Sequence, residues 1–260
     1  MLKAERQEQI VQRLTANGTA TVGAIARALQ VSEMTIRRDL EELAERGIIE
    51  RVYGGARLPV ALKESFSSSG IPLLREYSHV EKRRLHTEAK REVARRAAQL
   101  IKPGESVFLG AGTTVEAMIE FLPAAPLRIV TNSLSVFKLL EHSEQCELYL
   151  VGGLYRRQTG CFVGSMAEDA VAPLGIDKAF IGTNGVASGS LFTSDMDEGK
   201  IQRMVLDKAQ ERYAVCDASK VGRCDFYAFY SLSKLTALIC DSGLDRAHRE
   251  ELSQSVTLMA

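Results

Sequence analysis

The sequence of 260 residues contains no tryptophan, no Cys-x-x-Cys pair and no long apolar run. Its five cysteines are odd in number and far apart, so we expect neither disulfides nor zinc, and no cofactor. No stretch approaches the roughly 18 consecutive apolar residues of a membrane helix, and no signal peptide opens the chain, so a cytoplasmic protein without a membrane partner is expected. Lysine plus arginine (33) equals aspartate plus glutamate (33), so any binding to nucleic acid must come from a local surface.

The composition is that of an ordinary folded protein, with 45% hydrophobic and 25% charged residues. A chain of this length holds one large or two smaller domains. Residues 59–72 are rich in serine, glycine and proline and lack sustained periodicity, which is typical of a linker. We therefore predict an N-terminal domain over residues 3–58, a linker over 59–74 and a larger domain over 75–250.

The N-terminal segment has the pattern of three short helices followed by a β-hairpin. Apolar residues recur at helical spacing over residues 3–14, Thr21 can cap a second helix, and Ser32 can cap a third. A glycine then ends the third helix, and a β-prone run closes on Gly54-Gly55. This arrangement predicts a winged helix-turn-helix, in which the first turns of the third helix enter the major groove of DNA.

The charges on the third predicted helix are uneven, because Arg37 and Arg38 come first and three glutamates follow. Arginine can contact phosphates or guanine, and Met34 or Thr35 can meet a thymine methyl group. The net charge of residues 1–57 is only +1, nine basic against eight acidic residues, so a protein-interaction module remains an alternative. The candidate DNA-binding residues are Ser32, Glu33, Met34, Thr35, Arg37, Arg38, Arg51 and Tyr53.

The larger domain alternates short β-rich runs with helical stretches. The runs span residues 107–109, 128–130, 148–151, 179–181, 213–216 and 237–240. Such alternation predicts a Rossmann-like α/β domain, a mostly parallel sheet covered by helices. Residues 80–101 are predicted to form one amphipathic helix before the first strand. Because ligands bind at the carboxyl ends of parallel strands, we expect the site in the loops that follow them.

The loop after the first predicted strand, from Gly110 to Thr114, opens a helix. A helix N-terminus with glycines and two hydroxyls suits a phosphate, although the same residues could form a plain tight turn. Asp195 and Glu198 are predicted at the start of a later helix, as caps or as ligands, and Lys220 can supply a cation. The candidate effector-binding residues are Gly110, Gly112, Thr113, Thr114, Thr131, Asn132, Gly152, Gly153, Asn184, Gly185, Asp195, Glu198 and Lys220.

Two motifs in the N-terminal segment carry a family resemblance. Ser32-x-x-Thr35-Ile36-Arg37-Arg38-Asp39-Leu40, followed by Arg51-Val52-Tyr53-Gly54-Gly55-Ala56, resembles the signature of the DeoR family of bacterial sugar-metabolism regulators. The larger domain is similar to the effector domain of the same family. The resemblance implies a sugar-phosphate-binding fold akin to ribose-5-phosphate isomerase and glucosamine-6-phosphate deaminase, whose phosphate loops resemble Gly112-Thr113-Thr114.

Three positions depart from the common family pattern. The family usually has histidine at the position of Tyr53, aspartate at that of Gly110 and lysine at that of Gln202. The last two departures resemble the lactose phosphotransferase repressor branch, whose effector is tagatose 6-phosphate. The same departures are also consistent with a different sugar ring.

The resemblance implies a transcriptional repressor of sugar-metabolism genes, a homodimer or homotetramer that binds double-stranded operator DNA and is released by a phosphorylated sugar, such as tagatose 6-phosphate or a fructose phosphate. An activator or dual regulator would use the same sites. A sugar-phosphate isomerase or deaminase is a further alternative, with Asp195, Glu198 and Asp217 as candidate bases. The four histidines are predicted on the surface and away from the strand-end loops, so we expect no enzyme.

Overall fold

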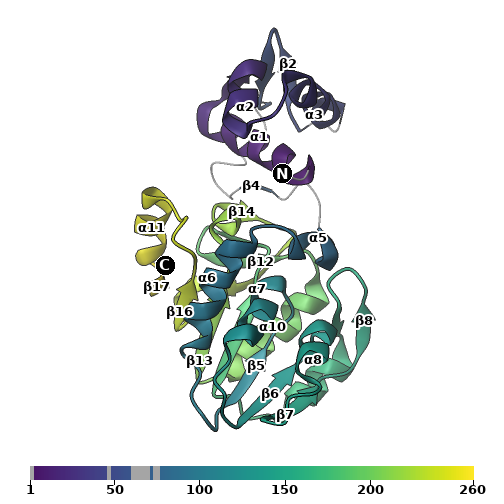
Figure 1. Cartoon of the computed structure of the whole chain (residues 1–260), viewed down its shortest axis with the longest axis vertical. Helices are drawn as coiled ribbons and strands as arrows, with labels where there is room; N and C mark the ends of the chain where they lie inside the picture. Colours follow the sequence, from purple (N-terminus) through teal and green to yellow (C-terminus); the bar gives the residue numbers. More distant parts are fainter. Residues whose placement is uncertain (1–2, 46–47, 60–70, 73–76) are drawn as a thin grey trace. The chain divides into compact units, whose positions relative to one another are not determined.

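The computed structural model describes residues 3–45, 48–59, 71–72 and 77–260. The chain divides into two compact units, Met1–Arg75 and Glu76–Ala260, which are drawn in Figure 1. Residues 60–70 and 73–74 of the predicted linker lie outside the described residues, and the predicted domain boundaries stay predictions. Within the described ranges, no helix is both long and apolar enough to cross a membrane.

The first unit is a winged helix-turn-helix. It consists of α1 (Lys3–Asn17), β1 (Thr19–Thr21), α2 (Val22–Leu29), α3 (Glu33–Glu45), β2 (Glu50–Val52) and β3 (Gly55–Arg57), and the strand order is β1-β3-β2. The two predicted caps are confirmed, since Thr21 accepts from the N–H of Ala24 and Ser32 accepts from the N–H of Thr35. Strand β1 is an addition that the sequence did not signal, because it is only three residues long.

The helices of the first unit close over a small apolar core. The core residues that are fully buried include Ile10, Leu14, Ile36, Leu40 and Leu43. One ion pair is buried beside this core, because Arg6 on α1 donates to both carboxylate oxygens of Asp39 on α3. The side chains of Arg6 and Asp39 are 12% and 2% exposed. This pair holds α1 to the helix that carries the candidate DNA contacts.

The second unit is built on a parallel sheet, as predicted, and the sheet has seven strands, one more than the six predicted. Its strands are β5 (Ser106–Leu109), β6 (Leu127–Thr131), β7 (Cys146–Leu150), β10 (Lys178–Gly182), β13 (Glu211–Val215), β16 (Ala237–Ile239) and β17 (Leu258–Met259). Their order across the sheet is β17-β16-β13-β10-β5-β6-β7. The chain therefore builds outward from β5 in one direction, returns, and builds outward from β10 in the other. The order reverses between β5 and β10, which is where such sheets open a crevice for ligands.

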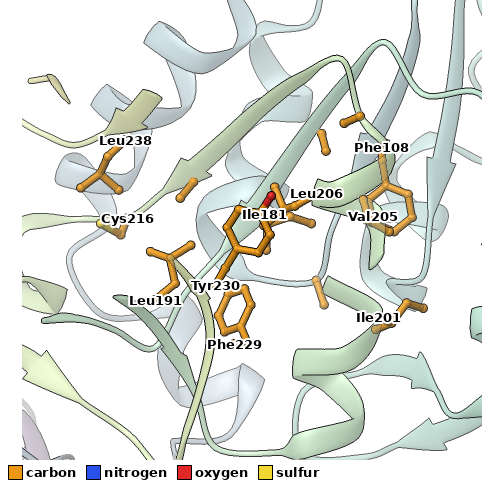
Figure 2. Close-up of a cluster of buried hydrophobic side chains, with 14 of the residues drawn as sticks. Phe108, Ile181, Leu191, Ile201, Val205, Leu206, Cys216, Phe229, Tyr230 and Leu238 are labelled. Atoms are coloured by element: carbon orange, nitrogen blue, oxygen red, sulfur yellow. The ribbon is translucent and has the colours of Figure 1, made fainter. Parts of the chain in front are cut away.

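Helices cover both faces of this sheet. One face packs against α6 (Thr87–Ala98), α7 (Thr113–Met118) and α8 (Leu134–Leu140), and the other against α9 (Ser165–Val171), α10 (Met196–Lys208) and α11 (Arg246–Ser253). Successive residues of β5 alternate between the two layers, as a strand requires, since Val107 and Leu109 face the first and Phe108 the second. Figure 2 shows the second layer, in which Phe108 and Ile181 of the sheet meet side chains of α10.

Several antiparallel strands flank the sheet, and the sequence did not predict them. β8 (Leu154–Arg156) and β9 (Cys161–Val163) form a hairpin, and β11 (Gly185–Ala187), β12 (Ser190–Thr193) and β15 (Tyr227–Ser231) form a small sheet. β14 (Arg223–Cys224) has two residues, as does β4 (Ile71–Pro72), which belongs to the first unit. These elements are short and mixed in polarity, so no period of two stands out along the chain.

The prediction of one helix over residues 80–101 is wrong. The segment forms two helices, α5 (His79–Arg83) and α6, because His86 takes a left-handed φ of 51° between them. Ser78 starts α5 with a capping box that it shares with Glu81. Glycine is the residue that usually takes this conformation, and the sequence has histidine at this position. The break between the two helices is therefore not marked in the sequence by a glycine.

Candidate nucleic-acid interface and ligand cavity

The first turns of α3 form an exposed face. Met34 is 64% exposed and the side chain of Arg37 is 49% exposed, while Arg38 is also exposed. The apolar side of the same helix is buried through Ile36 and Leu40, so the arginines cannot turn inward. Ser32 caps the helix and also hydrogen-bonds the hydroxyl of Thr35 at 2.9 Å. This face offers cations, a thioether and a helix N-terminus, the groups that contact phosphates and base edges.

The wing adjoins the helix face. The guanidinium of Arg51 on β2 donates to the backbone oxygen of Arg37 at 3.3 Å, which links the wing to α3. Tyr53, in the turn between β2 and β3, is fully exposed. Glu33 forms an ion pair with Arg37 at 3.4 Å and so reduces the positive charge of the face. All eight candidate DNA-binding residues lie on the first turns of α3 with its cap or on the wing.

The second unit contains a cavity at the point where the strand order reverses. Loops that follow β5, β10 and β13 line it, together with α5, α6 and α10, and it encloses about 730 Å³ with its open mouth included. The predicted ligand residues that line it are Gly112, Thr113, Thr114, Asn184, Glu198 and Lys220.

The loop after β5 brings the backbone close to the cavity. Gly112 has a φ of 143° at the start of α7, a conformation that side-chain-bearing residues rarely adopt. Gly110 does not line the cavity, because it packs against β10. A Cβ atom there would lie 2.8 Å from the Cδ1 atom of Ile181. The glycines thus let β5 and α7 approach β10, and Thr113 and Thr114 are left facing the cavity.

Three lysines give the cavity its positive charge. Lys82 of α5, Lys90 of α6 and Lys220 all line it, and Lys90 is only 5% exposed. Burial lowers the pKa of Lys90 to about 8, and the charges of Lys220 and Lys82 act in the same direction against the attraction of Asp217. Lys82 donates to the side-chain oxygen of Asn184 at 2.8 Å. A small anion in this cavity would meet charges that water reaches poorly.

Two buried oxygens in the cavity wall have no hydrogen-bond partner among the described residues. They are the amide oxygen of Gln202, which is 6% exposed, and one carboxylate oxygen of Asp217, which is 1% exposed. Burial would raise the pKa of Asp217, but the charges of Lys220, His86 and Lys90 and a hydrogen bond from Ser219 outweigh it, so its pKa is lowered. Asp217 is therefore a carboxylate, and both oxygens can accept from a hydroxyl group of a ligand.

Seven predicted ligand residues lie outside the cavity lining, namely Gly110, Thr131, Asn132, Gly152, Gly153, Gly185 and Asp195. Most of them either lie at or just after the ends of β6 and β7, two strands on the same side of the point where the strand order reverses, or pack closely against neighbouring residues. Thr131 donates to the backbone oxygen of Leu109 at 2.6 Å, and Asn132 donates to that of Phe162 at 3.0 Å. Asp195 caps α10 and pairs with Arg156 at 3.3 Å. The polar groups of Thr131, Asn132 and Asp195 make contacts within the protein that stabilise the fold.

Sequence reasoning missed the wall that α5 and α6 contribute. His79, Lys82, His86 and Lys90 line the cavity although they precede the first strand of the sheet. The prediction of surface histidines is wrong for His79, which is 15% exposed and hydrogen-bonded to Glu116, and for His86, which is half-buried. The one available signal was a lysine, Lys90, on the apolar side of an amphipathic helix.

Models of two protein domains match the chain. Residues 6–60 match the model of the DeoR-like helix-turn-helix domain, and residues 85–242 match that of the DeoR C terminal sensor domain. The two together define a regulator in which a DNA-binding domain is joined to a sensor domain. The chain belongs to the DeoR family.

Two curated relatives are similar to the chain over nearly its whole length. The chain is 39% identical to the lactose phosphotransferase system repressor of Streptococcus mutans serotype c over 243 residues, 93% of each protein. It is 39% identical to that of Lactococcus lactis subsp. lactis over 262 residues, 100% of this chain and 99% of the relative. The resemblance to this branch is confirmed, as is the expectation of a regulator and not an enzyme. The reason given for the latter, that no histidine lies at the site, is wrong.

Two solved structures are also similar to the chain. Ribose 5-phosphate isomerase A from Methanocaldococcus jannaschii is 20% identical with a TM-score of 0.37, over 52% of this chain and 54% of that one. The full-length sorbitol operon regulator SorC from Klebsiella pneumoniae is 14% identical with a TM-score of 0.37, over 90% of this chain and 94% of that one. Both TM-scores are low, so these likenesses carry no inference about function.

Proposed function

We propose that the chain is a transcriptional repressor of sugar-metabolism genes, which binds operator DNA through α3 and the wing and releases it when a phosphorylated sugar fills the cavity. The observation that carries this proposal is the exposed basic face of α3 in a domain that matches the DeoR-like helix-turn-helix. Relatives that are similar over nearly their whole length are named repressors, which supports the sign of regulation. Acting on operator DNA requires a cytoplasmic location.

The roles on DNA follow from the geometry of the first unit. The capped start of α3 suits the major groove, where Arg37 and Arg38 can contact guanine or phosphate and Met34 a thymine methyl group. Arg51 and Tyr53 on the wing suit contacts to the DNA backbone. An operator with two half-sites requires two such units, so the repressor acts as a homodimer or a homotetramer.

The roles in the cavity follow from its two chemistries. The loop Gly112-Thr113-Thr114 and the cations of Lys90 and Lys220 suit the phosphate group of the effector. The oxygens of Glu198, Gln202 and Asp217 suit its hydroxyl groups. The anionic end and the hydroxyl-rich end of the effector therefore contact different residues. Because the relatives are named for the lactose phosphotransferase system, tagatose 6-phosphate is the first effector to test, and fructose phosphates are the next.

A salt titration tests the DNA-binding part of the proposal. Mobility shifts are run with DNA from upstream of the protein's own operon and with a scrambled duplex, between 50 and 200 mM salt. If about 6–10 phosphates are contacted, affinity falls by roughly 10³–10⁵ over this range. Affinity that does not change with salt, or that is equal for the two duplexes, would contradict operator binding.

A further inference from the structure

Helix α5 joins the ligand cavity to the start of the second unit. Two of its residues, His79 and Lys82, line the cavity. The second unit begins at Glu76, and α5 is its first helix. Tyr77, which lies just before the cap of α5, is 4% exposed. A displacement of α5 is therefore carried along the chain to the first residues of the second unit, which follow directly on the DNA-binding unit.

Polar contacts hold α5 in its place. The structure describes all five residues of the helix and buries none of their side chains, so little apolar packing fixes it. The side chain of His79 hydrogen-bonds Glu116 of α7, and its backbone N–H donates to the carbonyl oxygen of Gln158 at 2.9 Å. Arg83 lies 3.6 Å from the other carboxylate oxygen of Glu116. A helix held by hydrogen bonds and ion pairs is displaced more easily than one with a buried apolar face.

Two further contacts of α5 are made inside the cavity. The ammonium group of Lys82 donates to the side-chain oxygen of Asn184 at 2.8 Å, and that of Lys90 donates to the backbone oxygen of Lys82. All three side chains line the cavity. A phosphate group is a stronger acceptor for an ammonium group than an amide oxygen is, because it is charged. An anion in the cavity therefore competes with Asn184 for Lys82, and with the backbone of α5 for Lys90.

The chain has a strained position immediately before α6. His86 takes a φ of 51°, a conformation that residues other than glycine adopt only where their surroundings enforce it. Helix α6, which follows, is fixed to the sheet by Val93, Ala94 and Ala97, which are fully buried. When the contacts of α5 change, the chain can turn at His86, so that α5 moves while α6 stays in place.

We propose that α5 is the element that transmits occupancy of the cavity to the DNA-binding unit. Without effector, the contacts of His79 with Glu116 and of Lys82 with Asn184 hold α5 in place. A bound phosphorylated sugar takes over the ammonium groups of Lys82 and Lys90, and α5 leaves its position. A ligand shifts such an equilibrium only by its difference in affinity for the two positions, and the exchanged contacts supply that difference. This mechanism rests on the proposed function, because it explains how a sugar phosphate releases the operator.

A variant that loosens α5 without altering the cavity lining tests the proposal. Glu116→Gln removes the charge that His79 and Arg83 contact, and Glu116 lies outside the cavity lining. Because the effector then displaces α5 at a lower cost, we expect tagatose 6-phosphate to bind about fivefold more tightly than to wild type. Glu120→Gln is the matched control, since it breaks an ion pair with Arg91 at 2.7 Å that does not involve α5. Titration calorimetry of the full chain without DNA measures all three proteins. Damage to the fold would instead weaken effector binding.

A second variant and a second measurement keep the proposal testable if Glu116→Gln does not fold. Arg83→Ala changes a side chain that is 60% exposed and lies outside the cavity lining, and it should tighten effector binding by about twofold. Hydrogen exchange of wild type follows α5 directly. On addition of tagatose 6-phosphate the amides of α5 should exchange faster, whereas a ligand that only covers α5 would slow them.

The outcomes separate this proposal from the proposed function. Effector binding in both variants that is no tighter than in Glu120→Gln, or slower exchange of the α5 amides with effector bound, would overturn the role of α5. Release of operator from wild type would then still support the repressor. Tighter binding and faster exchange without release of operator would contradict the repressor and leave the movement of α5 standing. If wild type binds neither tagatose 6-phosphate nor a fructose phosphate, both proposals fail.

Discussion

The two units differ in the exposure of their positively charged side chains. In the first unit Arg37 and Arg38 lie exposed on α3, where water reaches them. In the second unit Lys90 is buried in the cavity wall, and its pKa is lowered to about 8. An exposed cation suits a long polyanion that approaches from solution, and its effect is screened by salt. A buried cation suits a small anion that replaces water, and its effect depends on pH.

The largest expected effect separates the units by stability. Asp39→Ala leaves the guanidinium of Arg6 buried without its partner, which is expected to destabilise the first unit by about 3–5 kcal/mol. Calorimetry should show a lower melting transition for that unit and an unchanged transition for the other, with loss of DNA binding. Glu42→Gln is the control, because it breaks an exposed pair with Lys3 that is worth about 0–1 kcal/mol. Equal melting curves for the two variants would contradict the role of the buried pair.

The second effect tests the cavity alone. Lys220→Ala removes a charge-assisted contact to the effector, which contributes roughly 1.5–3 kcal/mol, or about 10–150-fold in affinity. Titration calorimetry with the sugar phosphate measures this loss, and operator affinity without effector should stay unchanged. Lys234→Ala, at an exposed lysine outside the cavity lining, is the control. Loss of operator binding in Lys220→Ala would show that the two sites are not separable.

The third effect tests the face of α3. Arg38→Ala is expected to weaken operator binding by about 1–3 kcal/mol while effector affinity stays unchanged. Glu41→Ala on the same helix is the control, since Glu41 is exposed beyond the basic turns. Fluorescence anisotropy with labelled operator measures both variants. A larger loss for Glu41→Ala than for Arg38→Ala would reverse the proposed orientation of the helix.

The smallest effect is the pH dependence of effector binding. Above pH 8 Lys90 in the empty cavity is mostly neutral, so an anion binds only with uptake of a proton, and affinity should fall by at most about tenfold per pH unit. For stability the sign is the opposite, because an unfolded lysine near 10.5 binds more protons than Lys90 between about pH 8 and 10.5, so stability rises there.

Calorimetry at pH 7.5 and 9 in buffers of different ionisation enthalpy measures the proton uptake. Lys90→Met keeps the length of the side chain without its charge and should abolish the uptake. If wild type and Lys90→Met show the same proton uptake on binding, another group in the cavity is responsible for the titration.

Most of the regular secondary structure could be predicted from the sequence. The caps Thr21 and Ser32, six of the seven parallel strands and the start of α10 at Asp195 each leave a local signal, and the structure has them all. Strand ends were also identified. Which strand ends line the cavity depends on the order of the strands across the sheet. That order is set by pairing between strands that are far apart in the sequence. Thr131 ends β6 and Gly152 follows β7, and both lie outside the cavity lining for this reason.

The helical wall of the cavity left almost no local signal. Lys82 and Lys90 precede the first strand, and they line the cavity because α5 and α6 separate at His86 and α6 packs on the sheet. A lysine on the buried side of an amphipathic helix is a weak sign on its own, because lysine side chains often extend past apolar neighbours to reach water. The β8–β9 hairpin also left almost no local signal in the sequence, because each of its strands has only three residues.

The most direct test of the account is release of operator DNA by an effector. Labelled operator bound to wild type and to Lys220→Ala is titrated with tagatose 6-phosphate, fructose 1-phosphate and fructose 6-phosphate, and anisotropy is followed. We expect at least one compound to release DNA from wild type, by roughly 5–150-fold in affinity, and to fail to release it from Lys220→Ala. Specific operator binding that none of these sugar phosphates weakens, or equal release from both proteins, would contradict it.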